Sequence, residues 1–396
     1  NALLTGALYF NTTSDAMKVY DGAAWVAVAP VATSVTLSQV TDFPSQTGES
    51  GKYLTTNGTD PSWADVSASP VAQAVASGAL ANGDLVVINA DGTVSVVAET
   101  AGAGSAGDPV VYAADYSGFN SATFDSTNNK VVIAYRDQGD SNYGKAIVGT
   151  VSGTSISFGS EAVFVSSAVS YCSAVFDSST GKVVIAYSDE GNSSYGTTIV
   201  GTVSGTSISF GTAVVFESGS TQHQEAVFDS TNNKVVISYR DTVNSNYGTA
   251  IVGTVSGTSI SFGTAVVYSA STSSTNGIAF SSTDGKIIIA YRDDGNSNYG
   301  TAIVGTVSGT SISFGTAVVF DSDGTTNWNR IIFNPDQTEI TISYANGGFS
   351  YRGYLIVGTV SGTTISFDSS IIFNPSGAND QGITYDSASD KIIIVC

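Results

Sequence analysis

The sequence predicts an all-β protein whose larger part is a β-propeller of four-stranded blades. The first observation is a ten-residue segment, VGTVSGTSIS, that returns at a period of 52 or 53 residues. Its copies begin at Val148, Val200, Val252, Val304 and, as VGTVSGTTIS, at Val357. A fixed period of this length is typical of stacked supersecondary units that bury their apolar faces against one another. The second observation is that β-rich runs alternate with turn residues, without the apolar spacing of a helix.

The repeat covering residues 225–268 contains the elements of one blade in order. The runs EAVFDS, KVVISYRD, TAIVGTVSG and SISFGTAVVY are separated by TNN, by TVNSNYG and by a Ser-Gly-Thr turn. The second run is apolar at the consecutive positions Val235, Val236 and Ile237, which predicts a strand covered on both faces. Four strands in a unit of this length indicate a propeller blade. Five full copies followed by GITYDS and KIIIVC predict at least six blades.

The two ends of the repeat array predict how the ring closes. The segment PVVYAADYS (109–117) matches the strand that ends each blade, and the segments at the C-terminus match the first two strands of a sixth blade. We therefore expect a strand at Val110–Tyr112 to pair into the blade that contains Lys391–Val395, which would remove the exposed sheet edges. Because the chain starts without Met and stops inside a repeat, we expect it to be a fragment of a longer polypeptide.

The first third of the chain lacks the repeat. We divide the chain into β-modules at 1–68, a β-hairpin module at 69–100 with its turn at Ala90-Asp91-Gly92, a Gly/Ala/Ser linker at 101–107 and the propeller at 108–396. Each small module has too few apolar residues to bury a core alone. We expect residues 1–100 to gain that core from neighbouring chains, as a homotrimer.

Composition limits the partners. The formal net charge is −20 and charged residues make up 12% of the chain. This acidic balance argues against nucleic acid and anionic membrane surfaces, which attract clusters of Lys and Arg. The two cysteines, Cys172 and Cys396, form neither a disulfide framework nor a zinc-binding pattern. No apolar stretch is long enough to predict insertion into a membrane.

Two groups of segments resemble proteins of tailed bacteriophages. GALYFNTTSDAMKVYDGAAW and GKYLTTNGTDPSW resemble segments of tail fibres and related appendages. The repeat VIAYRDxGNSNYGTAIVGTVSGTSISFGTAVVF resembles large structural proteins of marine cyanobacterial phages (cyanophages). The resemblance implies a virion structural protein, located outside the cell on a tail fibre or appendage, often trimeric and engaged in host attachment. Its partners would be other virion or tail proteins and a host cell-surface receptor, either a glycan or a protein.

The connections between blades are the variable part of the repeat. The third strand and the turn after it are nearly identical in all copies, whereas the segment from the fourth strand to the next blade differs each time. In a propeller these connections surround the mouth of the central channel. The candidate ligand-binding residues there are Phe119, Tyr171, His223, Trp328, Asn329 and Arg330, with Cys172 beside them. A binding face and freely drifting surface loops both explain the variation. Trp328 favours binding because an aromatic ring stacks on a sugar, although it is also able to cap the core.

The loops between the second and third strands contain several Asp and Asn residues, as in RDQGDSNYG (136–144) and RDDGNSNYG (292–300). Oxygen ligands of this kind suit Ca²⁺, but the same residues form hairpin loops, and the spacing is not that of an EF-hand. We favour the loop interpretation and predict no cofactor or metal. The recurring Arg–Asp pair is a candidate ion pair between blades, replaced in one copy by Ser188-Asp189.

Catalysis has little support in the sequence, so we expect no enzyme. The aspartates recur once per blade, which is typical of a structural role, and the Ser-x-Asp-x-Gly-x-Thr-Trp turns of sialidase propellers are missing. His223 is the only histidine, and Glu161, Glu217 and Glu225 are scattered singly. Two alternatives remain beside a phage attachment protein: a glycan-cleaving propeller enzyme on a phage appendage, and a secreted bacterial adhesin. A converging carboxylate pair in a deep pocket would favour the enzyme, and a shallow rim of exposed aromatics would favour attachment.

Overall fold

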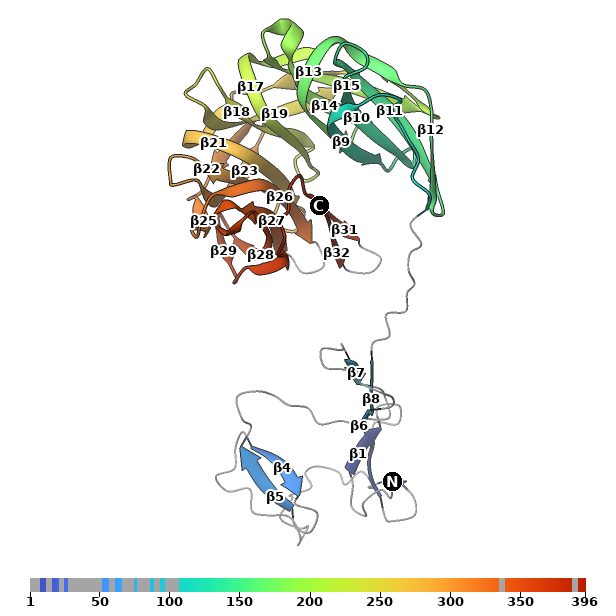
Figure 1. The fold of residues 1–396 in the computed structure, drawn as a ribbon, viewed down its shortest axis with the longest axis vertical. Coiled ribbons are helices and arrows are strands. Elements are labelled where there is room, and N and C mark those ends of the chain that lie inside the picture. The colour runs from blue at the N-terminus through green and yellow to red at the C-terminus, as the bar shows by residue number, and fades with distance from the viewer. Residues whose placement is uncertain are drawn as a thin grey trace. The chain divides into compact units, whose positions relative to one another are not determined.

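The computed structural model describes residues 107–396 apart from 335–338 and 387–390, together with the backbone of eight short strands before residue 107 (Figure 1). The side chains of residues 275 and 276 lie outside this description. The chain divides into two compact units, Asn1–Gly102 and Ala103–Cys396. The predicted linker at 101–107 lies mostly outside the described residues. No helix in the described part of the chain has the length and apolar character needed to cross a membrane.

The first unit contains small antiparallel sheets. Strands β1 (Leu8–Asn11), β2 (Ala16–Tyr20) and β3 (Trp25–Ala27) form a three-stranded meander. Strands β4 (Lys52–Thr56) and β5 (Pro61–Asp65) form a hairpin. Strands β7 (Val86–Ile88) and β8 (Thr93–Val96) form another hairpin, and β6 (Val75–Ala76) pairs with β8 in parallel. The antiparallel pairing of β7 with β8 agrees with the predicted hairpin, and its turn at residues 90–92 lies outside the described residues. Trimerisation of these modules stays a prediction.

The second unit consists of four-stranded blades numbered here in chain order. Blade 1 contains β9 (Ser117–Asp125), β10 (Lys130–Asp137), β11 (Tyr143–Ser152) and, as its fourth strand, β12 (Ser155–Phe158) with the start of β13 (Ala162–Asp177). The end of β13 is also the first strand of blade 2, with β14 (Lys182–Asp189), β15 (Tyr195–Ser204) and β16 (Ser207–Phe210). Each long strand of this kind therefore joins two blades.

The later blades repeat this pattern. Blade 3 runs through β17 (Val214–Asp229), β18 (Lys234–Asp241), β19 (Tyr247–Ser256) and β20 (Ser259–Phe262). Blade 4 runs through β21 (Val266–Ser281), β22 (Lys286–Asp293), β23 (Tyr299–Ser308), β24 (Ser311–Phe314) and β25 (Val318–Asp321). Blade 5 runs through β26 (Thr326–Asn334), β27 (Glu339–Asn346), β28 (Arg352–Ser361), β29 (Thr364–Phe367) and β30 (Ile371–Asn374). A two-stranded sheet follows, made of β31 (Gly382–Asp386) and β32 (Lys391–Val395).

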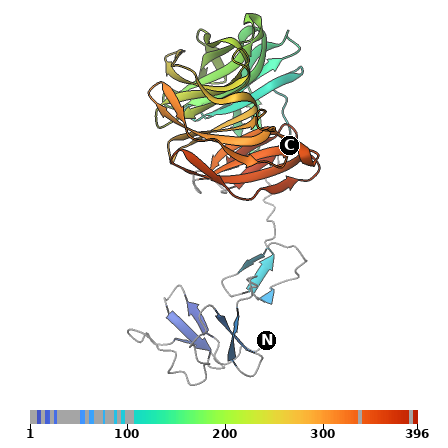
Figure 2. The same ribbon diagram turned by 90° about the vertical axis from the view of Figure 1, so that its left-hand side faces the viewer.

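The arrangement confirms the predicted all-β propeller. The first strands β9, β13, β17, β21, β26 and β31 contact one another in succession around the centre, with the other strands of each blade outside them (Figures 1 and 2). Five complete blades and a two-stranded sheet are described, and the number of blades in a complete ring stays a prediction.

The predicted closing strand is wrong. Val110–Tyr112 belongs to no strand, and no pairing of β32 with this segment occurs among the described residues. Tyr112 instead holds the segment on blade 1, because its hydroxyl bonds to Ser117 Oγ at 2.8 Å and its ring lies 5.4 Å from that of Tyr135. The sequence similarity to a closing strand therefore comes from this aromatic anchor, which every blade contains.

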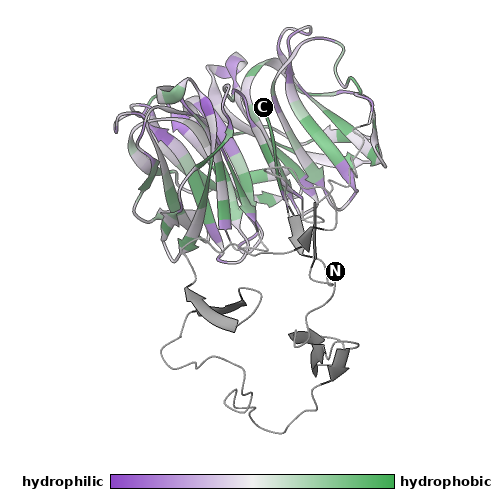
Figure 3. Cartoon of the chain, turned by 60° about the horizontal axis from the view of Figure 1, so that its bottom comes forward, coloured by the Kyte–Doolittle hydropathy of each residue, from purple (hydrophilic) through white to green (hydrophobic). Residues whose placement is uncertain are grey.

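The anchors form the hydrophobic contacts between consecutive blades. Phe164, at the end of blade 1, lies 5.1 Å from the ring of Tyr187 and 5.9 Å from that of Phe210, both in blade 2. Phe216, Tyr268 and Phe320 repeat this contact in the following blades. The second strands between them are buried on both faces, as predicted, and Figure 3 shows hydrophobic colour along the middle of the strands.

The constant Ser-Gly-Thr turns have a packing role at one end of the blades. A Cβ atom added to Gly159 would overlap the backbone carbonyl of Thr206, in the turn of the next blade. Gly211, Gly263 and Gly315 meet Thr258, Thr310 and Thr363 in the same way. We call this end, made of the Ser-Gly-Thr turns and the glycines that face them, the constant end. Close backbone approach explains why both segments hardly vary.

The aspartates that recur once per blade stabilise turns. The buried carboxylate of Asp125 accepts the amides of Thr127 and Asn128 at 2.9 and 3.0 Å. Asp177 and Asp229 do the same in the next two blades. The structural interpretation of these repeated residues is confirmed.

Candidate ligand-binding site at the channel mouth

The site begins with a β-bulge near the start of the first strand of each complete blade. In blade 2 the register of β13 against β14 shifts between Ser170 and Ser173, and blades 1, 3, 4 and 5 shift at the equivalent place. In blades 1, 2, 3 and 5 one residue of the bulge has a left-handed backbone: Phe119 (φ 50°), Tyr171 (52°), His223 (53°) and Trp328 (51°). Asp380 (49°), before β31, has the same backbone conformation. This conformation costs a large side chain on the order of 1–3 kcal/mol, and such strain gathers at functional sites.

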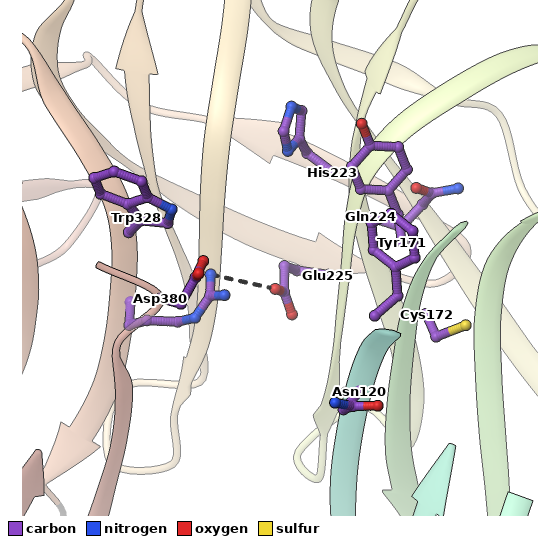
Figure 4. Close-up of a pocket in the computed structure, with 10 residues that line it drawn as sticks. Asn120, Tyr171, Cys172, His223, Gln224, Glu225, Trp328 and Asp380 are labelled. Atoms are coloured by element: carbon purple, nitrogen blue, oxygen red, sulfur yellow. Dashed lines mark ion pairs between the residues drawn. The ribbon is translucent and has the colours of Figure 1, made fainter. Parts of the chain in front are cut away.

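These bulges surround a cavity of about 260 Å³ at the mouth of the channel. It lies on the side of the loops between second and third strands, as predicted, and at the opposite end of the blades from the constant end. Its lining is Phe119, Asn120, Tyr171, Cys172, His223, Gln224, Glu225, Trp328, Arg330 and Asp380. Figure 4 shows Trp328 and Asp380 on one side of the cavity and Tyr171, His223 and Cys172 on the other. We call this space the mouth cavity.

Rings form part of its wall. The ring centroids of Phe119 and Tyr171 lie 5.0 Å apart, and those of Tyr171 and His223 lie 4.9 Å apart, so three neighbouring blades contribute one continuous row. Trp328 packs against Tyr351 of its own blade at 5.7 Å. A half-buried row of this kind offers flat apolar surface beside polar groups.

An ion pair connects blades 3 and 5 through the mouth cavity. Arg330 Nη1 lies 3.7 Å from Glu225 Oε1, and each side chain is about a third exposed, 37% and 34% respectively (Figure 4). Arg330 Nε also donates to the Gln381 carbonyl at 3.2 Å, and Ser173 Oγ donates to Glu225 Oε2 at 3.3 Å. Burial raises the pKa of Glu225, and the Arg330 guanidinium partly opposes this effect.

Two other groups of the cavity are uncharged at neutral pH. Burial lowers the pKa of His223 to about 4, and the positive charges of Arg240 and Arg292 add to that shift. The neutral imidazole is thus both a hydrogen-bond donor and an acceptor. Burial raises the pKa of the Cys172 thiol to about 12, so this side chain is a poor nucleophile.

The structure brings together most of the predicted site. Phe119, Tyr171, His223, Trp328 and Arg330 all line the mouth cavity, with Cys172 beside them. Asn329 is a correction, because it is fully buried and does not line the cavity. Its side chain is packed inside the propeller and so contributes no surface to the cavity.

Four further residues line the cavity without having been predicted from the sequence: Asn120, Gln224, Glu225 and Asp380. A shift of 52 or 53 residues relates Phe119, Tyr171, His223, Trp328 and Asp380, so alignment of the repeats contained the signal for Asp380. The cavity also combines the two features expected to separate the rival functions, since exposed rings and the carboxyl groups of Glu225 and Asp380 line the same space.

The Asp/Asn-rich loops use their oxygens within the fold. Asp137 Oδ1 accepts the amides of Gly139 and Asp140, and Lys145 Nζ lies 2.7 Å from Asp137 Oδ2. Those contacts hold the pKa of Asp137 below its usual range. In the described part of the chain no group of three or more His, Cys, Asp or Glu residues is arranged to hold a metal. Calcium binding by these loops stays untested.

The predicted Arg–Asp ion pair between blades is wrong in its partners. Arg136 Nη1 lies 4.0 Å from Glu190 of blade 2, whereas Arg292 Nε bonds to Asp294 in its own loop at 2.6 Å. The reason is that the Arg and the Asp that follows it are adjacent on one strand and point to opposite faces.

Comparison with known proteins gives matches among solved structures alone. No family model and no curated protein matches the chain. Among solved structures, the Aleuria aurantia lectin, a six-bladed β-propeller with a fucose recognition mode, matches at 14% identity and TM-score 0.42, covering 65% of this chain and 79% of its own. A Hadza microbial sialidase matches at 10% identity and TM-score 0.41, covering 65% and 58%. A putative 6-phosphogluconolactonase from Bacteroides uniformis matches at 10% identity and TM-score 0.47, covering 70% and 77%.

These structures correct one expectation. We expected no enzyme, but solved structures that match this chain include the sialidase and the putative lactonase as well as the lectin. Enzymes and binding proteins are both found among them, which contradicts the expectation of no enzyme. The chemistry of the site itself must decide.

Proposed function

We propose that this protein binds a carbohydrate in the mouth cavity of its propeller. The observation that carries the proposal is the row of strained bulge residues, Phe119, Tyr171 and His223, facing Trp328 across a space lined by polar groups. A sugar ring presents one apolar face and a rim of hydroxyl groups. The rings match the face, while Arg330, Glu225 and the neutral His223 match the hydroxyls.

The size of the cavity supports a small ligand. About 260 Å³ is slightly below the usual range of small-molecule sites, roughly 300–1,000 Å³. A terminal sugar residue of a longer glycan suits this volume better than an extended segment of chain. Arg330 and Glu225 are held in place by the Gln381 carbonyl and Ser173, so little side-chain order would be lost on binding.

For the biological setting we propose host attachment by a phage tail fibre or virion appendage, displayed outside the cell. The support is the resemblance of both the N-terminal segments and the repeat to phage structural proteins, together with the division into two units. The first unit would join the fibre, as a homotrimer, and the propeller would meet a host glycan. A secreted bacterial adhesin would use the mouth cavity in the same way.

One observation favours a second candidate, cleavage of the bound glycan. The carboxyl groups of Glu225 and Asp380 line the same cavity, and burial raises the pKa of Glu225. A glycoside hydrolase needs one protonated and one ionised carboxyl group. Glu225→Gln would abolish release of reducing sugar if cleavage occurs.

The test is glycan-array binding by the full chain, followed by titration of the best neutral glycan with matched variants. Trp328→Ala should weaken binding at least tenfold, about 1.4 kcal/mol. Phe124→Ala is the control, because this exposed ring lies on β9 toward the end opposite Phe119. Equal affinity for both variants and the unchanged protein, with melting temperatures preserved, would exclude the mouth cavity as the binding site.

A further inference from the structure

A second cavity, of about 280 Å³, lies beside the mouth cavity. Its lining is Phe119, Arg136, Ser170, Tyr171, Ser188, Glu190, Ser194, Ser220, Thr221 and Gln222. Phe119 and Tyr171 line both cavities, so the pair of rings 5.0 Å apart separates them. We call this second space the serine recess, because four of its lining residues are serines.

The recess coincides with a departure from the repeat. Two positions near the end of the second strand carry Arg and Asn in blades 1, 3 and 4, namely Arg136 with Asn142, Arg240 with Asn246, and Arg292 with Asn298. Blade 5 has Ala345 with Tyr351, whose ring packs on Trp328. Of the five complete blades described, blade 2 has small side chains at both positions, Ser188 and Ser194.

The contacts explain why the two serines of blade 2 leave space where other blades have Arg and Asn. In blade 3 the guanidinium of Arg240 occupies the region and donates from Nε to Asn246 Oδ1 at 3.0 Å. In blade 2 the short Ser188 hydroxyl donates to the carbonyls of Ser194 and Thr221, at 3.0 and 3.1 Å. Blade 2 therefore keeps its backbone contacts without a long side chain across the recess.

Arg136 gives the recess a positive group with free capacity. Its guanidinium lies 4.6 Å above the ring of Phe119, and its only ion pair described is the 4.0 Å contact with Glu190. Arg136 Nε is buried and has no hydrogen-bond partner among the described protein atoms. Because a guanidinium has five N–H donors in a planar fork, this arrangement suits a carboxylate bound through two oxygens. The Glu190 side chain is 40% exposed, so a bound carboxylate can replace it.

We propose that the serine recess is a second sugar subsite, selective for a residue that carries a carboxylate. The carboxylate binds Arg136, the sugar hydroxyls meet the serine and threonine side chains, and Phe119 and Tyr171 separate this residue from the one in the mouth cavity. The inference rests on the proposed function, since the two subsites share these rings. It makes the preferred ligand an acidic glycan, although the protein itself has a net charge of −20.

The experiment observes the arginine Nε–Hε signals of the full chain by NMR, with D-glucuronate, D-glucose and acetate as probes. The chain has five arginines, so the spectrum is sparse, and Arg136→Lys assigns the signal of Arg136. Glucuronate should shift that signal, while glucose and acetate at the same concentration should not. A shift of equal size with acetate, or no shift with glucuronate, would overturn the proposal.

The matched variant is Ser188→Arg with Ser194→Asn, which gives blade 2 the residues of blades 1, 3 and 4 and so suits the fold. It should weaken glucuronate binding at least tenfold while the affinity for a neutral glycan in the mouth cavity stays unchanged. Unchanged glucuronate affinity in this folded variant would mean that the anion binds elsewhere. A different result would separate the two proposals. If the glucuronate shift at Arg136 persists in Trp328→Ala and no variant binds a neutral glycan, the subsite in the serine recess would be supported. The proposed function of the mouth cavity would then be excluded.

Discussion

The two ends of the propeller blades differ in the contacts that restrict which residues can occur there. At the constant end, glycines such as Gly211 touch the backbone of the next blade's turn, so no side chain fits and the sequence hardly varies. At the mouth, the bulges of blades 1, 2, 3 and 5 project different side chains: Phe119, Tyr171, His223 and Trp328. Each end repeats its own backbone geometry from blade to blade. At the constant end, the backbone of the neighbouring blade fills the space beside the strand. At the mouth, side chains line that space instead, and they leave room for a ligand.

The largest expected effect is a loss of stability from a substitution at the constant end. Gly211→Ala places a methyl group on the carbonyl of Thr258, and relief requires two blades to separate. We expect a loss of about 3 kcal/mol in the free energy of unfolding, measured by urea denaturation. Gly205→Ala is the control, since its φ of 60° is strained but its surroundings are open, and about 1 kcal/mol is expected. Equal losses for both variants would mean that backbone approach does not limit this end.

The next effect concerns pH at the mouth. The pKa of His223 is lowered from 6.5 to about 4, so the folded protein binds fewer protons than the unfolded chain between these values. Stability is therefore fully present above pH 6.5 and falls as the pH decreases toward 4, by about 3 kcal/mol from this residue. Denaturation of the natural chain and of His223→Asn over this range measures the difference, because the carboxyl groups titrate in both. Parallel pH profiles would contradict the burial of His223.

The smallest expected effect compares the two ends as binding surfaces. Tyr171→Ala removes the central ring of the row and should lower glycan affinity about tenfold, or 1.4 kcal/mol. Ser204→Ala, in an exposed turn of the constant end, should change affinity less than twofold. Isothermal titration with the same glycan measures both variants. A larger loss for Ser204→Ala would assign binding to the opposite end of the blades.

Most of the fold could be predicted because the repeats compare the chain with itself. The strand order, the buried second strands and the turn role of Asp125 all follow from features that recur in every blade. Tyr112 misled the prediction because its aromatic ring recurs without the strand around it. A recurring residue shows which side chain a position requires. The ring of Tyr112 requires only contact with the neighbouring rings, so it recurs where there is no strand.

The candidate site was predicted less completely for a physical reason. A bulge reverses the alternation of inward and outward residues, so the buried Asn329 and the cavity-facing Glu225 could not be distinguished by counting along a strand. The serine recess depends on two positions six residues apart whose exchange matters only once the blade is folded. The left-handed backbone at Trp328 or Phe119 is likewise invisible in residue type, because neither is a glycine.

The near-identity of the constant-end segments also has a consequence for how such a protein changes over generations. Because the copies of VGTVSGTSIS differ so little, a segment that runs from one copy to the next has nearly the same junction sequence at both of its ends. An exchange between two copies transfers one complete bulge, with its ring or charge, and joins it to neighbours through unchanged glycine contacts. Exchange of one such segment for another would therefore change the side chains at the mouth and keep the contacts at the constant end.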